Sequence, residues 1–345
     1  MSFTALWPNK TLLWKEWMNT STITAFFVGF ITYISSYTLF NEIMLFREMA
    51  ARDISASGGA YLHFTTADLV WFNRAFEALG SVLFVTALAA VMVGQERDRK
   101  TFDLLLAMPY SRREVIYNKF LFGFGLLLAV FVLNALIMTV LIAVNPGIVP
   151  FDPARVWEWA LRNVLVLGFV FAFTMFISSM SGTTLGNGLL ALIFLFFPVG
   201  ITALIAINMD AVFHLYTNEL VNLLWEIGQR LTVPTYILGI GYYEDDNLMY
   251  VYGLVILATW VLYKLTQYLF ARNQMENNGE VLMFGRMEGF FKLGVAVCFA
   301  LLIGPMVMHR WNPGVFTAIV VYLLVGGAFW LLVSEIINWR KKALT

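Results

Sequence analysis

The longest stretch of this chain without a charged side chain runs from Asn163 to Met209. A helix that crosses a bilayer needs roughly 20 apolar residues, so the stretch is long enough for two crossings. Its middle holds the helix-breaking segment 181–188, where we place the boundary between the two helices. With 60% hydrophobic and only 13% charged residues, the chain has too few charges to cover a soluble protein. The sequence therefore predicts an all-α polytopic membrane protein.

Apolar runs bounded by charged residues predict about eight transmembrane helices in total. We divide the chain into a six-span domain, residues 1–270, and two additional spans with a cytoplasmic C-terminus, residues 271–345. The spans outside the stretch described above are Met18–Asn41, Ala78–Gln95, Leu121–Val144, Leu248–Phe270, Leu293–His309 and Trp311–Ile337.

Three segments outside the spans have the composition of surface helices. Thr11–Met18 carries two tryptophans beside a lysine and a glutamate, which predicts a helix in the membrane interface; alternatively, it forms the first turns of span one. Phe151–Arg162 predicts a similar helix on the outer surface. Ala211–Tyr243 is apolar but interrupted by proline and glycine, so we expect outer or re-entrant helices between spans five and six.

The distribution of basic residues sets the orientation. If the termini and the connector between spans two and three share one side, that side holds 15 of the 22 lysine and arginine residues and every lysine. Basic residues gather in cytoplasmic loops. We therefore expect a multi-pass plasma-membrane protein with both termini and this connector in the cytoplasm.

Several chemistries have no support in the sequence. No GxxxxGK[ST] phosphate loop is present, so we expect no nucleotide site of that kind in this chain. The three histidines are scattered and the single cysteine, Cys298, lies in an apolar run, so neither a metal site nor an intrachain disulfide is expected. The net charge of zero does not favour a nucleic-acid partner. No arrangement of catalytic residues suggests an enzyme.

The polar residues inside the spans are neutral, whereas carriers driven by ion gradients usually keep ionisable groups at membrane depth. A transporter of this composition would take its energy from elsewhere. Hydrogen bonding between helices is the simpler explanation for these residues. The candidates for lining a pathway are Asn134, Thr139, Thr174 and Ser178.

The connector, residues 95–119, concentrates charge and has a helical pattern. Phe102, Leu105 and Leu106 follow helical spacing, and Pro109 ends that helix. The sequence from Ser111 to Glu114 fits a capping box that starts the next helix, with Ser111 capping it and Glu114 reaching back to the Ser111 amide. A solvated loop that only fixes the topology would explain the charge but not the leucines. An amphipathic helix beneath the membrane is suited to contact with a cytosolic partner.

The connector resembles the signature of type-2 ABC exporter permeases. In that family an acidic-basic opening is followed by T-x-[DE]-x-L-L and P-x-[ST]-R-x-[DE] before a span. The two extra spans at the C-terminus resemble an eight-span subgroup found in antibiotic-resistance and cell-envelope-stress exporters of Gram-positive bacteria. The residues that the resemblance assigns to ATPase coupling are Glu96, Arg97, Asp98, Phe102, Asp103, Leu104, Leu105, Leu106, Pro109, Ser111, Arg112, Arg113 and Glu114.

The resemblance implies a six-span permease domain over residues 1–270 that forms half of an export pathway. It implies two separate ATPase subunits that bind the ATP and magnesium, and a second permease, identical or paralogous. Membrane lipids surround the complex, and the neutral spans favour an amphipathic substrate such as an antibiotic, peptide or lipid. The alternatives are a scaffold or sensor that docks a regulatory ATPase without transport, and an intramembrane enzyme, which the missing catalytic residues disfavour.

Overall fold

The computed structural model describes residues 8–56, 74–98, 110–146, 152–180, 183–213, 219–238, 248–272, 287–308 and 315–344. Every regular element in these ranges is a helix, which confirms the all-α class. The chain forms two compact units: unit 1 comprises residues 1–192 and 233–281, and unit 2 comprises residues 193–232 and 282–345. The predicted division at residue 270 follows different bounds and stays a prediction.

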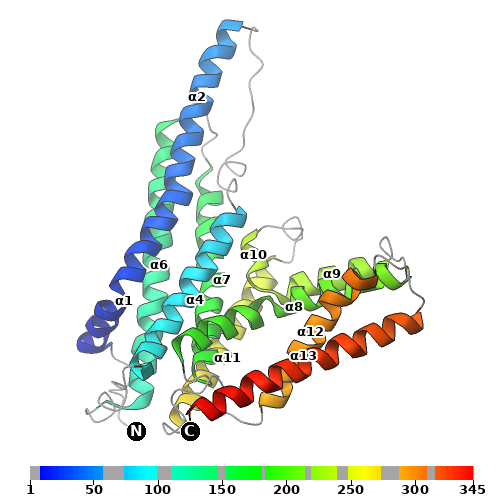
Figure 1. Cartoon of the computed structure of the whole chain (residues 1–345). Coiled ribbons are helices and arrows are strands. Elements are labelled where there is room, and N and C mark those ends of the chain that lie inside the picture. The colour runs from blue at the N-terminus through cyan, green and yellow to red at the C-terminus, as the bar shows by residue number, and fades with distance from the viewer. Residues whose placement is uncertain are drawn as a thin grey trace. The chain divides into compact units, whose positions relative to one another are not determined.

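The first half of unit 1 is built from long helices (Figure 1). α1 (Lys10–Ile31), the π-helix η2 (Thr32–Tyr37) and α2 (Thr38–Ala56) follow one another without a break. α4 (Arg74–Asp98) and α6 (Arg112–Val144) both pack against α1.

α7 (Pro153–Ser178) packs against α4, α6 and α11 (Leu248–Arg272) and therefore lies at the centre of unit 1. The short helix α10 (Thr235–Leu238) packs against α4 and α7.

Aromatic side chains hold the core of unit 1 together. The ring of Phe131 on α6 contacts Phe27 of α1 at 6.4 Å and Trp159 of α7 at 5.4 Å between centroids. All three side chains are buried. Gly123 lets α6 approach α7 closely, because a Cβ there would overlap the ring of Phe171. This contact agrees with the close packing that small residues permit between membrane helices.

α8 (Thr184–Phe213) begins in unit 1 and continues in unit 2, which also contains α9 (Glu219–Leu231), α12 (Met287–Met308) and α13 (Val315–Leu344). α12 and α13, which correspond to the two additional predicted spans, pack side by side. The Asn208 side chain of α8 donates to the Leu301 carbonyl of α12 at 2.7 Å and accepts from the Tyr322 hydroxyl of α13. These bonds join three helices within unit 2.

Seven of the described helical stretches are long and apolar enough to cross a membrane. Six correspond to the predicted spans one to six and one to span eight, so the polytopic prediction is confirmed. Predicted span seven falls on α12, whose apolar stretch, Lys292–Val307, is shorter than the other seven. A break between the two helices is confirmed, because α7 ends at Ser178 and α8 begins at Thr184, although residues 184–188 of the predicted break are helical.

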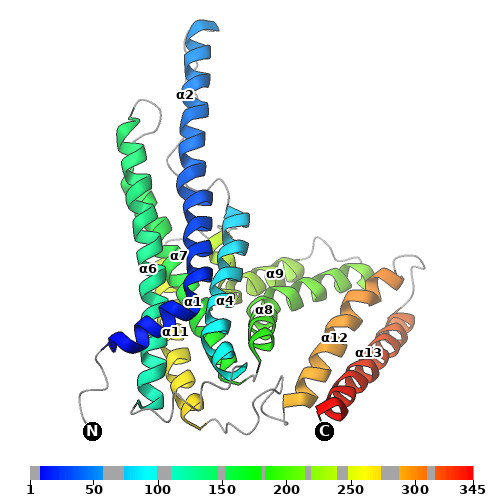
Figure 2. The same cartoon turned by 60° about the vertical axis from the view of Figure 1, so that its left-hand side comes forward.

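Two predicted surface helices are parts of longer helices. Thr11–Met18 forms the first turns of α1, the alternative considered for it, and Figure 2 shows these turns at an angle to the rest of α1. The prediction of a separate outer helix at Phe151–Arg162 is wrong, because α7 runs without interruption from Pro153. Arg162 is buried rather than on the surface, and Nη2 donates to Glu158 at 2.6 Å. Pairing within the helix allows the charge to stay inside the fold.

Candidate functional site

The two helices that flank the connector are both described, and the start of α6 is well defined. Ser111 has an extended backbone, and its hydroxyl accepts a hydrogen bond from the Glu114 amide at 3.2 Å. The predicted N-cap is therefore confirmed. The reciprocal bond, from the Ser111 amide to the Glu114 carboxylate, is absent from the hydrogen bonds of the described residues, so half of the capping box forms.

The middle of the connector lies outside the described residues, and so do the side chains of Arg97 and Asp98 at the end of α4. Their predicted contact with an ATPase stays a prediction. The same holds for Phe102, Asp103, Leu104, Leu105, Leu106 and Pro109.

A cluster of buried charges joins the two ends of the connector to α1. The ammonium nitrogen of Lys119, on α6, lies 2.8 Å from Glu16 Oε1 on α1 and 2.7 Å from Glu96 Oε1 on α4. It also donates to the Met92 carbonyl of α4 at 2.6 Å. Lys15 of α1 is paired with Glu96 as well and lies 3.5 Å from Glu16. We call Lys15, Glu16, Glu96 and Lys119 the charge cluster.

The charge cluster is almost completely shielded from its surroundings. The side chains of Lys119, Glu16 and Glu96 are 0%, 2% and 3% exposed, and that of Lys15 is 27% exposed. Two ammonium groups face two carboxylates, so the cluster is neutral when all four are ionised. An isolated charge would be very costly at such a position. The four side chains therefore depend on one another, and α1, α4 and α6 are held in one arrangement.

A second contact holds the beginning of α1 against the beginning of α6. The Asn9 amide donates to Asn118 Oδ1 at 2.9 Å, and Asn118 Nδ2 donates to the Glu114 carbonyl at 2.9 Å. The side chain of Asn9 caps α1 by accepting from the Thr11 amide. The residue that caps α1 is thus attached about two turns after the start of α6.

The predicted coupling residues at the start of α6 differ in their surroundings. Arg112 Nη1 lies 3.5 and 3.4 Å from the carbonyl oxygens of Phe270 and Ala271, at the end of α11. Arg113 is exposed and Glu114 is half-buried. Among these residues, Arg113 is therefore the most accessible to a partner.

Sequence reasoning treated Lys119, Lys15 and Glu16 as charges that set the topology and missed their pairing. One signal was present: acidic and basic residues stand within a turn of the apolar runs of three spans, all on the same predicted side. Charges at equivalent depth on neighbouring helices can pair. Which helices are neighbours was not evident from the sequence.

The predicted pathway residues mostly hydrogen-bond within the helical bundle. Buried Asn134 accepts from the Ser36 hydroxyl of η2 at 2.7 Å, which is the interhelical bonding considered as the alternative. Thr139 and Thr174 donate to carbonyls of their own helices, both four residues earlier. Ser178 is buried at the end of α7. Their role in a pathway stays a prediction.

A further buried acid lies at the opposite end of α4 from the connector. Glu77 is 5% exposed and accepts a hydrogen bond from Trp159 Nε1 at 3.0 Å. Both ends of α4 thus carry a buried carboxylate that is bonded to another helix of unit 1.

Part of the chain that contains the connector and its flanking helices is similar to known proteins. Residues 63–199 match the profile of a family described as ABC-2 family transporter protein. The chain is 23% identical over 207 residues to a Bacillus subtilis protein named as a probable ABC transporter permease, YtrC, covering 59% of each chain. It is 23% identical over 212 residues to a second one, YtrD, covering 60% of this chain and 61% of the relative. The chain thus spans about three fifths of the length of these curated relatives.

No solved structure matches the chain. The family match includes α4, the connector, α6, α7 and the first half of α8, and therefore the Glu96 and Lys119 members of the charge cluster. Residues 63–199 accordingly resemble the ABC-2 transporter family, and the described helices are those of a multi-pass membrane protein.

Proposed function

We propose that this chain is the membrane-spanning subunit of an ATP-driven ABC exporter. It forms half of the export pathway with a second permease, identical or paralogous, and two cytosolic ATPase subunits bind the ATP and magnesium. The observation that carries the proposal is the charge cluster, which fixes both ends of the family's signature connector to α1.

The charge cluster gives the connector a rigid attachment. A loop that hangs from two independent helices would bend when a partner pushes on it, and the displacement would end there. Here Lys119 holds the last turns of α4 and the first turns of α6 to α1, so a displacement of the connector moves three helices together. Packed elements that move as units can carry a small shift to a distant site. This is what coupling between an ATPase and a pathway requires.

The substrate in this proposal is amphipathic, such as an antibiotic, peptide or lipid. The predicted pathway residues are neutral, and the members of the charge cluster are paired with one another within unit 1. A small ion would need fixed counter-charges or dense polar ligands along its route. The membership of an eight-span antibiotic-resistance and cell-envelope-stress subgroup remains part of the proposal.

The direct test is purification of the full chain with an ABC ATPase encoded beside it, followed by reconstitution into lipid vesicles. We expect a stable complex and ATP-dependent transport of an amphipathic compound. Leu105→Asp should abolish co-purification, because truncating or charging a buried interface residue typically costs about 1–4 kcal/mol. Arg99→Ala serves as the matched control, because an exposed rim charge contributes far less.

Two outcomes would count against the proposal in different ways. A complex that forms and hydrolyses ATP but moves no compound indicates the scaffold or sensor instead. A complex that survives Leu105→Asp with transport intact shows that the connector only fixes the topology.

A further inference from the structure

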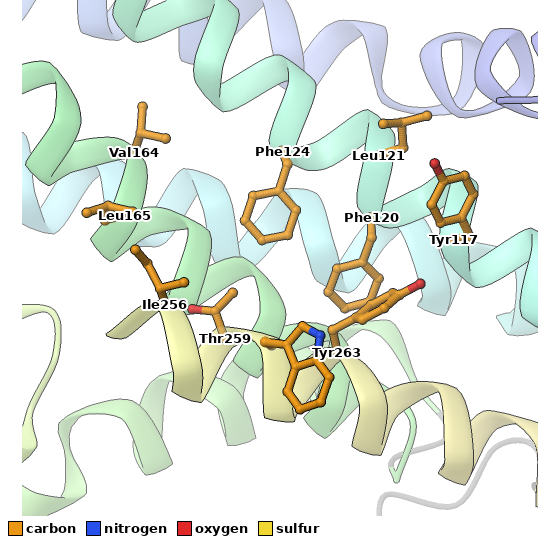
Figure 3. A pocket seen from close by; sticks show the side chains of 10 residues that line it. Tyr117, Phe120, Leu121, Phe124, Val164, Leu165, Ile256, Thr259 and Tyr263 are labelled. Carbon is orange, nitrogen blue, oxygen red and sulfur yellow. The ribbon is translucent and has the colours of Figure 1, made fainter. Parts of the chain in front are cut away.

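A groove of about 470 Å³ lies between α6, α7 and α11 in unit 1 (Figure 3). Phe120 and Tyr263 form part of its wall, with their rings edge to face at 4.9 Å between centroids. Val164 contributes from α7. Ile256 and Trp260 of α11 also line the groove and are 53% and 57% exposed, so this side is open.

Two polar groups in the wall, the hydroxyls of Thr259 and Tyr263, are engaged by their own helix. The Thr259 hydroxyl donates to the Val255 carbonyl at 2.7 Å. The Tyr263 hydroxyl accepts from Gln267 Nε2 at 2.6 Å. The wall therefore offers aromatic and aliphatic surface, and the part of a ligand that fits it is hydrocarbon.

The groove is elongated along the helices. On α11 it extends from Tyr263, beside Lys264, to Ile256, which lies two helical turns or about 12 Å from Lys264. One leaflet contributes about half of a hydrocarbon core that is roughly 30 Å thick. The groove thus extends over most of one leaflet, on the side of unit 1 that holds the ends of the connector.

A cation stands at the connector end of the groove. Lys264 is exposed, and its nitrogen lies 5.7 Å from the Trp260 ring centroid and 5.4 Å from that of Tyr263. Among the residues that the structure describes, no carboxylate is paired with it. An ammonium that lies two turns before the end of a membrane helix is stabilised by an anion at the headgroup level. The rings of Trp260 and Tyr263 hold it at the mouth.

We propose that the groove binds an acyl chain of an anionic phospholipid, with Lys264 contacting the phosphate of the headgroup. A neutral amphiphile would fill the apolar wall and leave the ammonium without a counter-ion. A zwitterionic lipid would bring a second cation to a mouth where no carboxylate of the described residues receives it. An anionic lipid fills the apolar groove with its acyl chain and provides a counter-ion for Lys264.

The test measures how added lipid changes the thermal midpoint of the purified full chain in detergent. Phosphatidylglycerol and phosphatidylcholine with identical chains are titrated against the wild type, Lys264→Gln and Lys10→Gln. Lys10 is an exposed lysine at the start of α1 and is not among the residues that line the groove, so its variant has the same change in charge. We expect phosphatidylglycerol to reach half of its effect at a concentration at least fivefold lower than phosphatidylcholine does. Lys264→Gln should remove this preference, and Lys10→Gln should retain it.

Lipid with brominated chains provides a second, independent readout, because bromine quenches tryptophan fluorescence at short range. Saturable quenching by brominated phosphatidylglycerol should be present in the wild type and lose the contribution of Trp260 in Trp260→Phe, while the quenching of other exposed tryptophans is the same in both. The proposal is overturned if the two lipids act alike on the wild type, or if the two lysine variants behave identically. It is also overturned if the fluorescence of Trp260 changes with protein concentration in the absence of lipid, since a second copy of the chain then occupies the groove. No ATPase is present, so the result is independent of the proposed transport function.

Discussion

Replacing Lys119 with methionine tests the charge cluster most directly. The change keeps a side chain of similar length and removes the completely buried ammonium that contacts both carboxylates. At an effective dielectric constant of about 20, each contact represents roughly 6 kcal/mol of gross Coulomb attraction. Desolvation of the three groups offsets most of this. Removing one partner leaves the desolvation of the others uncompensated, and the expected net destabilisation of unit 1 is about 3–5 kcal/mol.

The size of the effect should depend on which charge is removed. After Lys119→Met, two carboxylates share one partly exposed lysine. After Glu16→Gln, one carboxylate still has two ammonium groups, and Lys15 can turn toward solvent because it is 27% exposed. We therefore expect Glu16→Gln to cost less than Lys119→Met. The triple variant Glu16→Gln/Glu96→Gln/Lys119→Met should regain much of the lost stability, because neutral replacement of buried ion pairs is often tolerated and the remaining Lys15 can reach solvent.

The assay is the thermal midpoint of the purified chain in detergent, followed by the monomeric fraction after heating. One kcal/mol shifts the midpoint by about 2 °C in a larger domain, so Lys119→Met should lower it by about 6–10 °C. Arg155→Met is the control, since the Arg155 side chain is 55% exposed and its ion pairs contribute about 0–1 kcal/mol. Equal midpoints for Lys119→Met and the wild type would refute the reasoning, as would a triple variant less stable than Lys119→Met.

Three further outcomes can be checked with the same material. Gly123→Ala should lower the thermal midpoint because its Cβ would overlap the Phe171 ring, whereas Gly125→Ala, which has open space beside it, should leave the midpoint unchanged or raise it. Ser111→Ala removes the cap of α6 and should destabilise by about 0.5–2 kcal/mol, seen as faster amide hydrogen exchange in residues 112–116. The purified chain without an ATPase should show no stoichiometric nucleotide binding in equilibrium dialysis.

The sequence was informative wherever a local pattern decides the structure. The limits of α6 could be predicted, because Ser111 supplies a cap and Asn145 precedes a proline. The break between α7 and α8 followed from a cluster of glycine, serine and threonine. In each case the determining residues lie next to one another in the chain.

Prediction failed where the structure depends on residues that are distant in sequence. The charges of Phe151–Arg162 suggested a surface helix, but Arg162 pairs with Glu158 and also donates to the Tyr252 hydroxyl of α11 at 3.0 Å. A charged turn can thus continue a buried helix once its partners are in place. The charge cluster was missed for the same reason, since Glu16 and Lys119 are separated by more than a hundred residues.

The charge cluster is better explained by the fixed arrangement that it imposes on the helices than by a gain in folding stability. Buried ion pairs contribute little net stability compared with apolar residues, but they fix one register between the groups that they join. In the proposed function, that register determines whether a movement of the connector reaches α1. The triple variant separates the two effects, because it should fold and bind an ATPase yet hydrolyse ATP with less transport per turnover. If its transport per ATP equals that of the wild type in vesicles, the charge cluster serves only folding and the proposed coupling through Lys119 is wrong.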